Sequence, residues 1–190
     1  MIRTVKATLA ALLLWPITLG LASAADDAFD LGQVDEGGYV VMLRHALAPG
    51  TGDPARFTLG DCSTQRTLSE EGRDQARAIG QRLRQAGISK ARVFSSQWCR
   101  CLSTAALLGL GQVEELPALN SFYGPNRPMR AKRLSDLRAF LADQPTDGPL
   151  IILVTHQVTV SAITGTFVSS GGAKVLKLDG SEAPKVVGAF

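Results

Sequence analysis

The chain has 190 residues, of which 45% are hydrophobic and 19% are charged. These values are ordinary for a globular protein and predict one domain with its own core, with little support for disorder or a repeat array. The 20 basic and 17 acidic residues leave a formal net charge of +3. So small an excess gives no support to a nucleic-acid partner.

The first 24 residues have the order that is typical of a secretory signal peptide. Arg3 and Lys6 precede an apolar run over residues 7–22, and a small-residue triplet, Ala22-Ser23-Ala24, ends the segment. We expect cleavage after this triplet, so that the protein is secreted and resides in the periplasm.

The alternative to cleavage is a retained membrane anchor. The apolar run is shorter than the roughly 20 residues that a membrane span needs, and Pro16 interrupts it. We therefore favour a mature domain over residues 25–190 with no transmembrane span. Without Arg3 and Lys6, that domain has 18 basic and 17 acidic residues, a formal net charge of +1.

Expected strands and helices alternate along the rest of the chain. Apolar runs predict strands at residues 38–44, 91–96, 112–116 and 149–155, and two short edge strands at 174–178 and 185–187. Helical spacing predicts helices from Ser69, as N-cap, to Gly87, over 98–108, over 130–142, and from Val158. This alternation predicts an α/β fold, a three-layer αβα sandwich with a mostly parallel central sheet.

The only two histidines each follow a predicted buried strand. His45 comes directly after residues 38–44, and His156 comes directly after the most apolar strand, 149–155. In parallel α/β sheets, functional sites gather at the carboxyl ends of the strands. We therefore expect the two imidazoles to share one site.

Two arginines are expected at the same edge of the sheet. Arg44 adjoins His45, and Arg100 falls on the first turn of the helix that follows residues 91–96. Such a cluster of positive charge is costly alone but matches a phosphate dianion, because arginine binds phosphate oxygens in a bidentate manner and a helix N-terminus adds backbone donors.

Four segments, in order, resemble the histidine phosphatase superfamily (branch 1, phosphoglycerate mutase-like fold). Leu43–Ala46 is similar to its Arg-His-Gly signature, with Ala in place of Gly. Arg66–Ala76 resembles its Leu-Ser/Thr-x-x-Gly-x-x-Gln-Ala segment, and Phe94–Ala105 its Ser-Ser-x-x-x-Arg-x-x-x-Thr-Ala segment. Thr155-His156 is similar to the second histidine of the family.

The resemblance implies a phosphatase that needs neither a metal nor a cofactor. Neutral His45 would attack phosphorus and form a phosphohistidine, which water then hydrolyses. Arg44, Arg100 and His156 would hold the phosphoryl oxygens and stabilise the transition state. Two further residues, Arg66 and Gln157, are candidates for substrate binding, although Arg66 is equally well interpreted as a surface arginine.

The proton donor for the leaving group is the weak point of the resemblance. Many relatives carry an acidic residue directly after the second histidine, where this chain has Gln157, and the segment before Tyr123-Gly124 contains no glutamate. Glu115 is our candidate acid, and the other acidic candidates are Glu114, Asp53 and Asp61. The alternatives are a substrate with a good leaving group, an acid from the loop over residues 46–68, or low activity.

Three cysteines allow one disulfide, and export permits it. Cys62 is expected to pair with Cys99 or with Cys101, because the latter two lie too close together on a helix to pair with each other. The same spacing argues against a metal site. Trp98 and Phe94 are expected in the core.

The sequence thus predicts an exported phosphatase acting on a small or envelope-linked phosphorylated compound, such as a phosphorylated sugar. The alternative is a phosphate-binding or interaction module on the same fold that has lost turnover. A mutase is a third and weaker hypothesis, because export separates the protein from phosphoglycerate. The sequence leaves the oligomeric state open.

Overall fold

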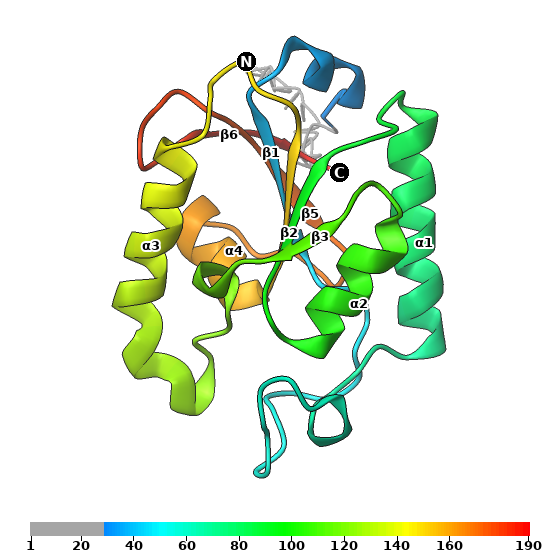
Figure 1. Ribbon diagram of the computed structural model, residues 1–190, viewed down its shortest axis with the longest axis vertical. Helices are drawn as coiled ribbons and strands as arrows, with labels where there is room; N and C mark the ends of the chain where they lie inside the picture. Colours follow the sequence, from blue (N-terminus) through cyan, green and yellow to red (C-terminus); the bar gives the residue numbers. More distant parts are fainter. Residues whose placement is uncertain (1–28) are drawn as a thin grey trace, which may run out of the picture.

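The computed structural model describes residues 29–190 (Figure 1). The expected signal peptide, residues 1–24, lies outside this range. None of the helices within the described residues is long and apolar enough to cross a bilayer.

A six-stranded mixed sheet forms the centre of the molecule, in the order β3-β2-β4-β1-β5-β6. Its strands are β1 (Tyr39–Arg44), β2 (Arg92–Ser95), β3 (Val113–Glu115), β4 (Ile151–Thr155), β5 (Ala173–Lys177) and β6 (Lys185–Ala189). The first four strands of that order run parallel to one another, whereas β5 and β6 are antiparallel additions. The carboxyl ends of β1, β2 and β4 therefore meet at one edge of the sheet.

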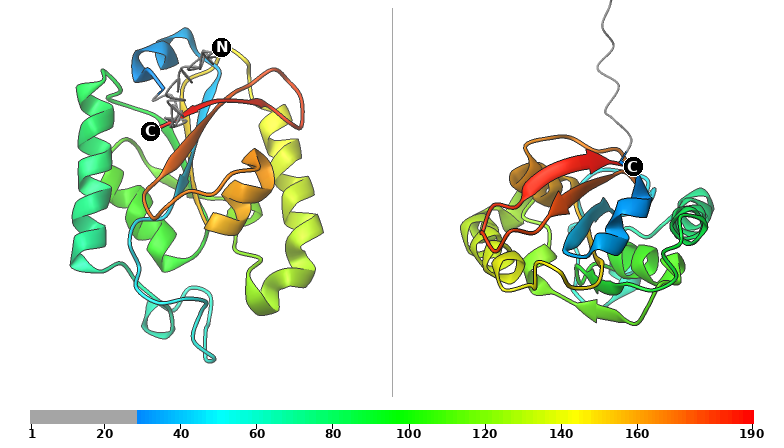
Figure 2. Two further views of the ribbon diagram at one scale, coloured as in Figure 1. Left: turned by 180° about the vertical axis from the view of Figure 1, so that it is seen from behind. Right: turned by 90° about the horizontal axis from the view of Figure 1, so that it is seen from above.

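Two helices cover each face of this sheet (Figures 1 and 2). On one face lie α1 (Glu70–Gln85) and α2 (Cys99–Leu108), and on the other lie α3 (Arg130–Ala142) and α4 (Gln157–Thr164). Short 3-10 helices occupy Leu31–Glu36, Cys62–Thr64, Pro117–Leu119 and Gly124–Met129. The predicted three-layer αβα sandwich is confirmed.

Side-chain alternation along β1 divides the core into two layers. Val41 and Leu43 pack into the cluster beneath α1 and α2, whereas Val40 and Met42 pack into the cluster beneath α3, with Leu137. Successive residues of a strand point to opposite faces, so a strand that is apolar throughout must be covered on both sides. β1 is such a strand, and it places its last residue and His45 at the edge where the site forms.

The prediction that residues 174–178 form an edge strand was wrong. β5 pairs with β1 on one side and with β6 on the other, and Val175 and Leu176 are fully buried. Only β6 lies at that edge, where Val186 and Val187 are partly exposed. Periodicity indicated a strand in both segments, but neighbour order depends on which strands meet in space.

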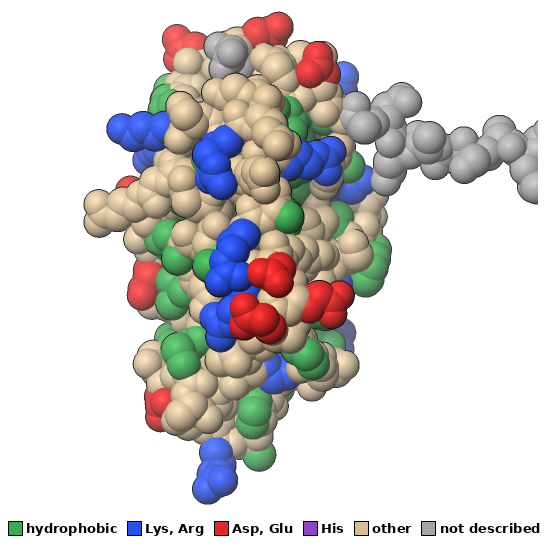
Figure 3. Space-filling view, turned by 90° about the vertical axis from the view of Figure 1, so that its right-hand side faces the viewer, with side chains coloured by type: hydrophobic (Ala, Val, Ile, Leu, Met, Phe, Trp, Pro, Cys, Tyr) green, Lys and Arg blue, Asp and Glu red, His purple; other side chains and the backbone are tan. Residues whose placement is uncertain are grey.

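The solvent-facing side of α1 carries closely mixed basic and acidic side chains (Figure 3). Arg73 and Arg77 pair with Glu70, and Arg77 also pairs with Asp74. These exposed pairs contribute little to stability. Such pairs are typical of a solvated helix face.

The start of α1 is fastened to the backbone that follows His45. Ser69 caps the helix as predicted, because its hydroxyl accepts a hydrogen bond from the Gly72 N–H at 3.1 Å. The Gln75 carbonyl oxygen accepts from the Leu47 N–H at 2.9 Å, and its amide nitrogen donates to the Ser170 carbonyl at 2.8 Å. The Ser-x-x-Gly-x-x-Gln pattern of this segment therefore holds the start of α1 in place beside the residues that follow His45.

Gly72 permits the closest approach in this region. A Cβ added at Gly72 would lie 2.0 Å from the carbonyl oxygen of Leu47. We expect Gly72→Ala to lower the free energy of unfolding by about 1–3 kcal/mol, because overpacking outweighs the better helix propensity of alanine, about 1 kcal/mol at most. Urea denaturation measures this change. Gln81→Ala, at an exposed position of the same helix, is the control, and an unchanged Gly72→Ala protein would contradict the expectation.

Candidate active site

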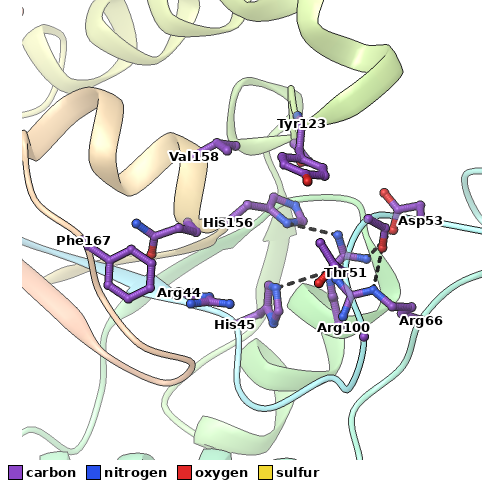
Figure 4. Close-up of a pocket in the computed structure, with 14 residues that line it drawn as sticks. Arg44, His45, Thr51, Asp53, Arg66, Arg100, Tyr123, His156, Val158 and Phe167 are labelled. Atoms are coloured by element: carbon purple, nitrogen blue, oxygen red, sulfur yellow. Dashed lines mark hydrogen bonds and ion pairs between the residues drawn. The ribbon is translucent and has the colours of Figure 1, made fainter.

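A cavity of about 250 Å³ lies at the carboxyl ends of the parallel strands (Figure 4). All six residues that the sequence predicted as catalytic or substrate-binding line it: Arg44, His45, Arg66, Arg100, His156 and Gln157. They come from the ends of β1 and β4, from the first turns of α2 and α4, and from the loop before α1. The fold thus brings together segments that are up to 113 residues apart in the sequence (from Arg44 to Gln157).

His45 is oriented by its own neighbour in the chain. Its Nδ1 lies 2.8 Å from the carbonyl oxygen of Ala46. A carbonyl can only accept, so Nδ1 carries the hydrogen and Nε2 is unprotonated, with a lone pair that can accept. The Ala46 backbone supplies this contact without a positive φ angle, since no non-glycine residue of the described chain has one. Alanine therefore serves where related sequences have glycine.

The environment of His45 keeps its imidazole neutral. The side chain is only 4% exposed, and this burial lowers its pKa to about 3, against the stabilising hydrogen bond to Ala46. The positive charges of Arg100, Arg44 and Arg66 lower the pKa further. A buried imidazole beside guanidinium groups cannot readily take up a positive charge. The imidazole of His45 is accordingly unprotonated at Nε2 at neutral pH.

His156 faces His45 across the cavity. The ring centroids are 5.6 Å apart, and the ring planes meet at 70°. The Nε2 of His156 lies 2.8 Å from the hydroxyl oxygen of Ser96, which in turn lies 3.2 Å from Oδ1 of Asn120. Burial first, and then the charge of Arg100, hold the pKa of His156 well below its usual value. Its Nδ1 edge is thereby held toward the cavity.

Arg100 connects these groups through three nitrogen atoms of one guanidinium. Nε donates to Nε2 of His45 at 3.2 Å, and Nη2 lies 3.4 Å from Nδ1 of His156. Nη1 forms an ion pair of 2.7 Å with Oδ1 of Asp53. The side chain of Arg100 is 3% exposed. Its position on the first turn of α2, as predicted, is what gives it this reach.

Two further arginines add positive charge to the lining of the cavity. Arg44 donates from Nη1 to the Val168 carbonyl at 3.0 Å, but its Nε is buried and has no hydrogen-bond partner within residues 29–190. Buried donors are normally satisfied, so this Nε fits an anion in the cavity. Arg66 is half-buried and donates to the carbonyls of Gly52, Ala48 and Pro49. Arg66 therefore holds the loop before α1 in place by these hydrogen bonds and also lines the cavity.

Gln157 lines the cavity but uses its amide elsewhere. The Nε2 group donates to the Ser161 hydroxyl at 2.6 Å, and Oε1 accepts from the Val168 N–H at 3.2 Å. These bonds hold the segment that contains Phe167, an exposed aromatic residue at the cavity rim. Nothing in the sequence marked Phe167 as part of the site.

Only one of the acidic residues considered as proton donors lies at the cavity. Glu115 is exposed on β3, accepts a hydrogen bond from Gln97 at 2.9 Å, and does not line the cavity. Our preference for Glu115 therefore lacks structural support, because β3 is an edge strand on the far side of β2 from His45. Glu114 and Asp61 are also exposed and outside the cavity lining. Among the described residues, Asp53 is the only acidic one that lines it.

Asp53 is held by two partners. Besides the ion pair with Arg100, its Oδ2 accepts a hydrogen bond of 3.0 Å from Nε1 of Trp98. Trp98 and Phe94 are buried, as predicted. Trp98 also stacks on Phe57 with ring centroids 5.0 Å apart. The sequence placed Trp98 in the core but offered no signal that it orients a carboxylate.

A disulfide joins the loop to the helix of Arg100. Cys62 pairs with Cys99, which decides between the two predicted partners. Cys101 is a buried thiol with its sulfur 3.5 Å from Nε2 of His156, and burial raises its pKa to about 12. No three His, Cys, Asp or Glu side chains in the described chain are grouped as metal ligands would be.

One family model matches the part of the chain that contains most of this site. The family model described as histidine phosphatase superfamily (branch 1) matches residues 40–124, which include His45, Arg66 and Arg100. None of the curated proteins matches the chain.

Solved structures share the fold at low sequence identity. The protein histidine phosphatase SixA complexed with tungstate is 18% identical, with a TM-score of 0.57, over 80% of this chain and 96% of its own. A phosphoglycerate mutase from Thermus thermophilus is 17% identical, with a TM-score of 0.57, over 80% and 98%. A mycobacterial glucosyl-3-phosphoglycerate phosphatase is 18% identical, with a TM-score of 0.54, over 80% and 98%.

The family match covers the segment of His45, the start of α1 and the helix of Arg100, and the fold supplies His156 at the expected strand end. Residues 40–124 thus match the histidine phosphatase superfamily (branch 1), and the chain shares its fold with the solved structures named above.

Proposed function

We propose that the protein is a phosphatase that hydrolyses a phosphomonoester through a phosphohistidine on His45. One observation supports this most strongly. The Ala46 carbonyl holds the His45 ring so that an unprotonated Nε2 meets the Arg100 guanidinium at the wall of the cavity. A neutral nucleophile beside fixed positive charge is the arrangement that attack on a phosphoryl group requires.

The positive groups act on the phosphoryl oxygens. A bound phosphate draws the Nε–H of Arg100 away from His45 and takes up the unpaired Nε–H of Arg44. The lone pair of His45 Nε2 then forms the N–P bond while the bond from phosphorus to the leaving oxygen breaks. Most of the barrier reduction in such transfers comes from positioning and electrostatic stabilisation.

The second step releases inorganic phosphate. Water attacks the phosphorus atom, the N–P bond breaks, and the electron pair returns to Nε2 of His45. The arginine side chains that stabilise the first transition state serve the second as well. Apart from the attacking water, both steps use only side chains of the protein.

Asp53 is our proposed proton donor for the leaving oxygen. Its carboxylate reaches the cavity wall, and a phosphate dianion bound to Arg100 competes for the same guanidinium. A carboxyl group at this position is placed to donate a proton to the departing alkoxide.

The substrate class follows from the size of the cavity and the proposed location. A volume of about 250 Å³ lies below the roughly 300–1,000 Å³ of typical ligand pockets, which favours a compact phosphorylated group. The signal-like residues 1–24 and the Cys62–Cys99 disulfide both support export to the periplasm. We therefore propose a phosphorylated sugar or an envelope-linked phosphate as the substrate.

The phosphohistidine can be detected directly. The protein is incubated with labelled acetyl phosphate in EDTA and quenched, and we expect an acid-labile, base-stable phosphoprotein. His45→Asn should abolish the label, because His45 and His156 are the only histidines in the sequence. His156→Asn is the matched control and should label more slowly while keeping the site of attachment. Binding of phosphate or vanadate without label or turnover would instead indicate a binding module.

The role of Asp53 depends on the leaving group. For Asp53→Asn we expect kcat/KM to fall by about 100-fold or more with an alkyl phosphate but to change little with p-nitrophenyl phosphate, whose leaving group needs no proton. Glu115→Gln is the control and should leave both substrates unaffected. An equal loss with both substrates would show that Asp53 only positions Arg100.

The neutral histidines predict how stability depends on pH. The pKa of His45 is about 3 in the folded protein against 6.5 for the free side chain. The unfolded chain alone takes up this proton, so stability is fully present above about pH 6.5 and decreases toward pH 3. We expect a loss of about 2 kcal/mol for each histidine between about pH 7 and pH 5, measured by urea denaturation, because the slope approaches about 1.4 kcal/mol per pH unit only below the pKa of the unfolded side chain. His45→Asn should flatten the curve, and a pH-independent wild type would refute the assignment.

A further inference from the structure

A buried polar network lies behind His156, outside the lining of the catalytic cavity. Ser96 follows β2, and its backbone N–H donates to the Val154 carbonyl of β4 at 2.9 Å, two residues before His156. Asn120 follows the 3-10 helix Pro117–Leu119. Ser96 is fully buried and Asn120 is 4% exposed, and neither lines the cavity. Any effect of these side chains on the reaction therefore passes through a neighbouring group.

The hydrogen positions in this network follow from groups that can act in only one way. The backbone N–H of Gln97 donates to Oδ1 of Asn120 at 2.9 Å, which identifies this atom as the amide oxygen. Because an amide oxygen only accepts, the Ser96 hydroxyl donates to it at 3.2 Å. The Ser96 oxygen has then used its one hydrogen, so it accepts from Nε2 of His156 at 2.8 Å. His156 therefore carries its hydrogen on Nε2.

The cavity side requires the same tautomer. Nη2 of Arg100 lies 3.4 Å from Nδ1 of His156, and a guanidinium has no acceptor, so Nδ1 presents a lone pair (Figure 4). The Cys101 sulfur lies 3.5 Å from Nε2 but also 3.6 Å from the Thr155 carbonyl, which accepts the thiol hydrogen. His45 has the opposite tautomer, so both imidazoles turn an unprotonated nitrogen toward Arg100.

This tautomer has a consequence for phosphate binding. The oxygens of a phosphate dianion only accept hydrogen bonds, and so does the unprotonated Nδ1 of His156. A hydrogen bond between them requires a proton on Nδ1. A phosphomonoester has a second pKa of about 6, by analogy with phosphorylated side chains, and its monoanion carries such a proton.

Charged and titratable groups surround His156 from several elements. Those of the catalytic cavity and of the nearby helices are Arg44, His45, Asp53, Arg66, Arg100, Cys101, Tyr123 and Arg133. Burial first, and then the charge of Arg100 and the other positive groups, hold the pKa of His156 well below its usual value. A bound phosphate brings negative charge to the same place, so Nδ1 takes up a proton only together with the phosphate.

We propose that Ser96 and Asn120 are positioning residues that hold His156 as the Nε2–H tautomer, so that Nδ1 receives the proton of a bound phosphate monoanion. The proton leaves the P–OH group, binds the Nδ1 lone pair, and returns to the phosphate that is released, so no further reactant is needed. The imidazolium donates to a phosphoryl oxygen and stabilises its charge. This inference rests on the proposed phosphatase function and adds the residues that orient its second histidine.

NMR measures the tautomers without any turnover. The protein, free of a histidine tag, is labelled with ¹⁵N-histidine, and two-bond ¹H–¹⁵N correlations are recorded at about pH 7. The only two histidines, His45 and His156, should appear as the Nδ1–H and the Nε2–H tautomer respectively, and His156→Asn assigns the signals. An Nδ1–H tautomer for His156 overturns the inference.

Matched serine variants separate positioning from packing. In Ser96→Ala the Nε2–H signal should move upfield or disappear, and kcat/KM with p-nitrophenyl phosphate should fall by about tenfold or more, because a buried donor loses its acceptor. Ser95→Ala removes another fully buried hydroxyl, which donates to the Ser96 carbonyl at 2.8 Å, and should leave both readouts unchanged. An equal loss in the two variants, or an unchanged spectrum in Ser96→Ala, overturns the inference.

Asn120→Asp keeps the network but changes its charge. The carboxylate still accepts from Ser96 and Gln97, and its negative charge favours the imidazolium of His156. With p-nitrophenyl phosphate the leaving group needs no proton from Asp53, so the alkaline limb of kcat reports the proton on His156. We expect this limb to move to higher pH by about half a unit or more. An unmoved limb contradicts the inference, even where Ser96→Ala fails to fold.

Failure of the proposed function gives a different result. If His45 is not labelled and no substrate turns over, inorganic phosphate is titrated into the ¹⁵N-labelled protein at about pH 6. Protonation of Nδ1 of His156 with rising phosphate supports the positioning role in a phosphate-binding module. An Nδ1 that stays unprotonated overturns it. Labelling of His45 together with an Nδ1–H tautomer of His156 overturns the inference and leaves the phosphatase function standing.

Discussion

The Arg100 guanidinium contacts side chains from three separate segments: His45 after β1, His156 after β4, and Asp53 in the loop before α1. Its direction is fixed by the first turn of α2 and by the ion pair with Asp53. Without it, two buried imidazoles and a loop carboxylate would have no common partner. The rest of the site depends on this group, because it sets where negative charge is accepted and, after burial, its charge lowers the pKa of His45.

Burial and positive charge act together at this site. His45 and His156 are nearly inaccessible to solvent, and this burial and the neighbouring arginines make a positive charge on either ring unfavourable. The folded protein thus accepts a destabilising cluster, including the unpaired Nε of Arg44, that a bound dianion would relieve. Such local conflicts with stability are expected at functional sites.

Several residues that look like a sequence signature act on the backbone rather than on a ligand. Ser69, Gly72 and Gln75 fix the start of α1 against Leu47, two residues beyond His45. The Cys62–Cys99 disulfide likewise ties the loop to the helix of Arg100. The geometry of the catalytic cavity is therefore maintained from outside it.

The sequence alone determined the strand and helix order, the layered fold, and the placing of His45, His156, Arg44 and Arg100 at one edge, because periodicity and strand-end position are local patterns. Only the tertiary structure decided that β5 is an interior strand, that Cys99 is the disulfide partner, and that the acid at the cavity is Asp53 rather than Glu115. These outcomes depend on which segments meet in space. A loop carboxylate or an edge strand has no periodic pattern that reports its neighbours.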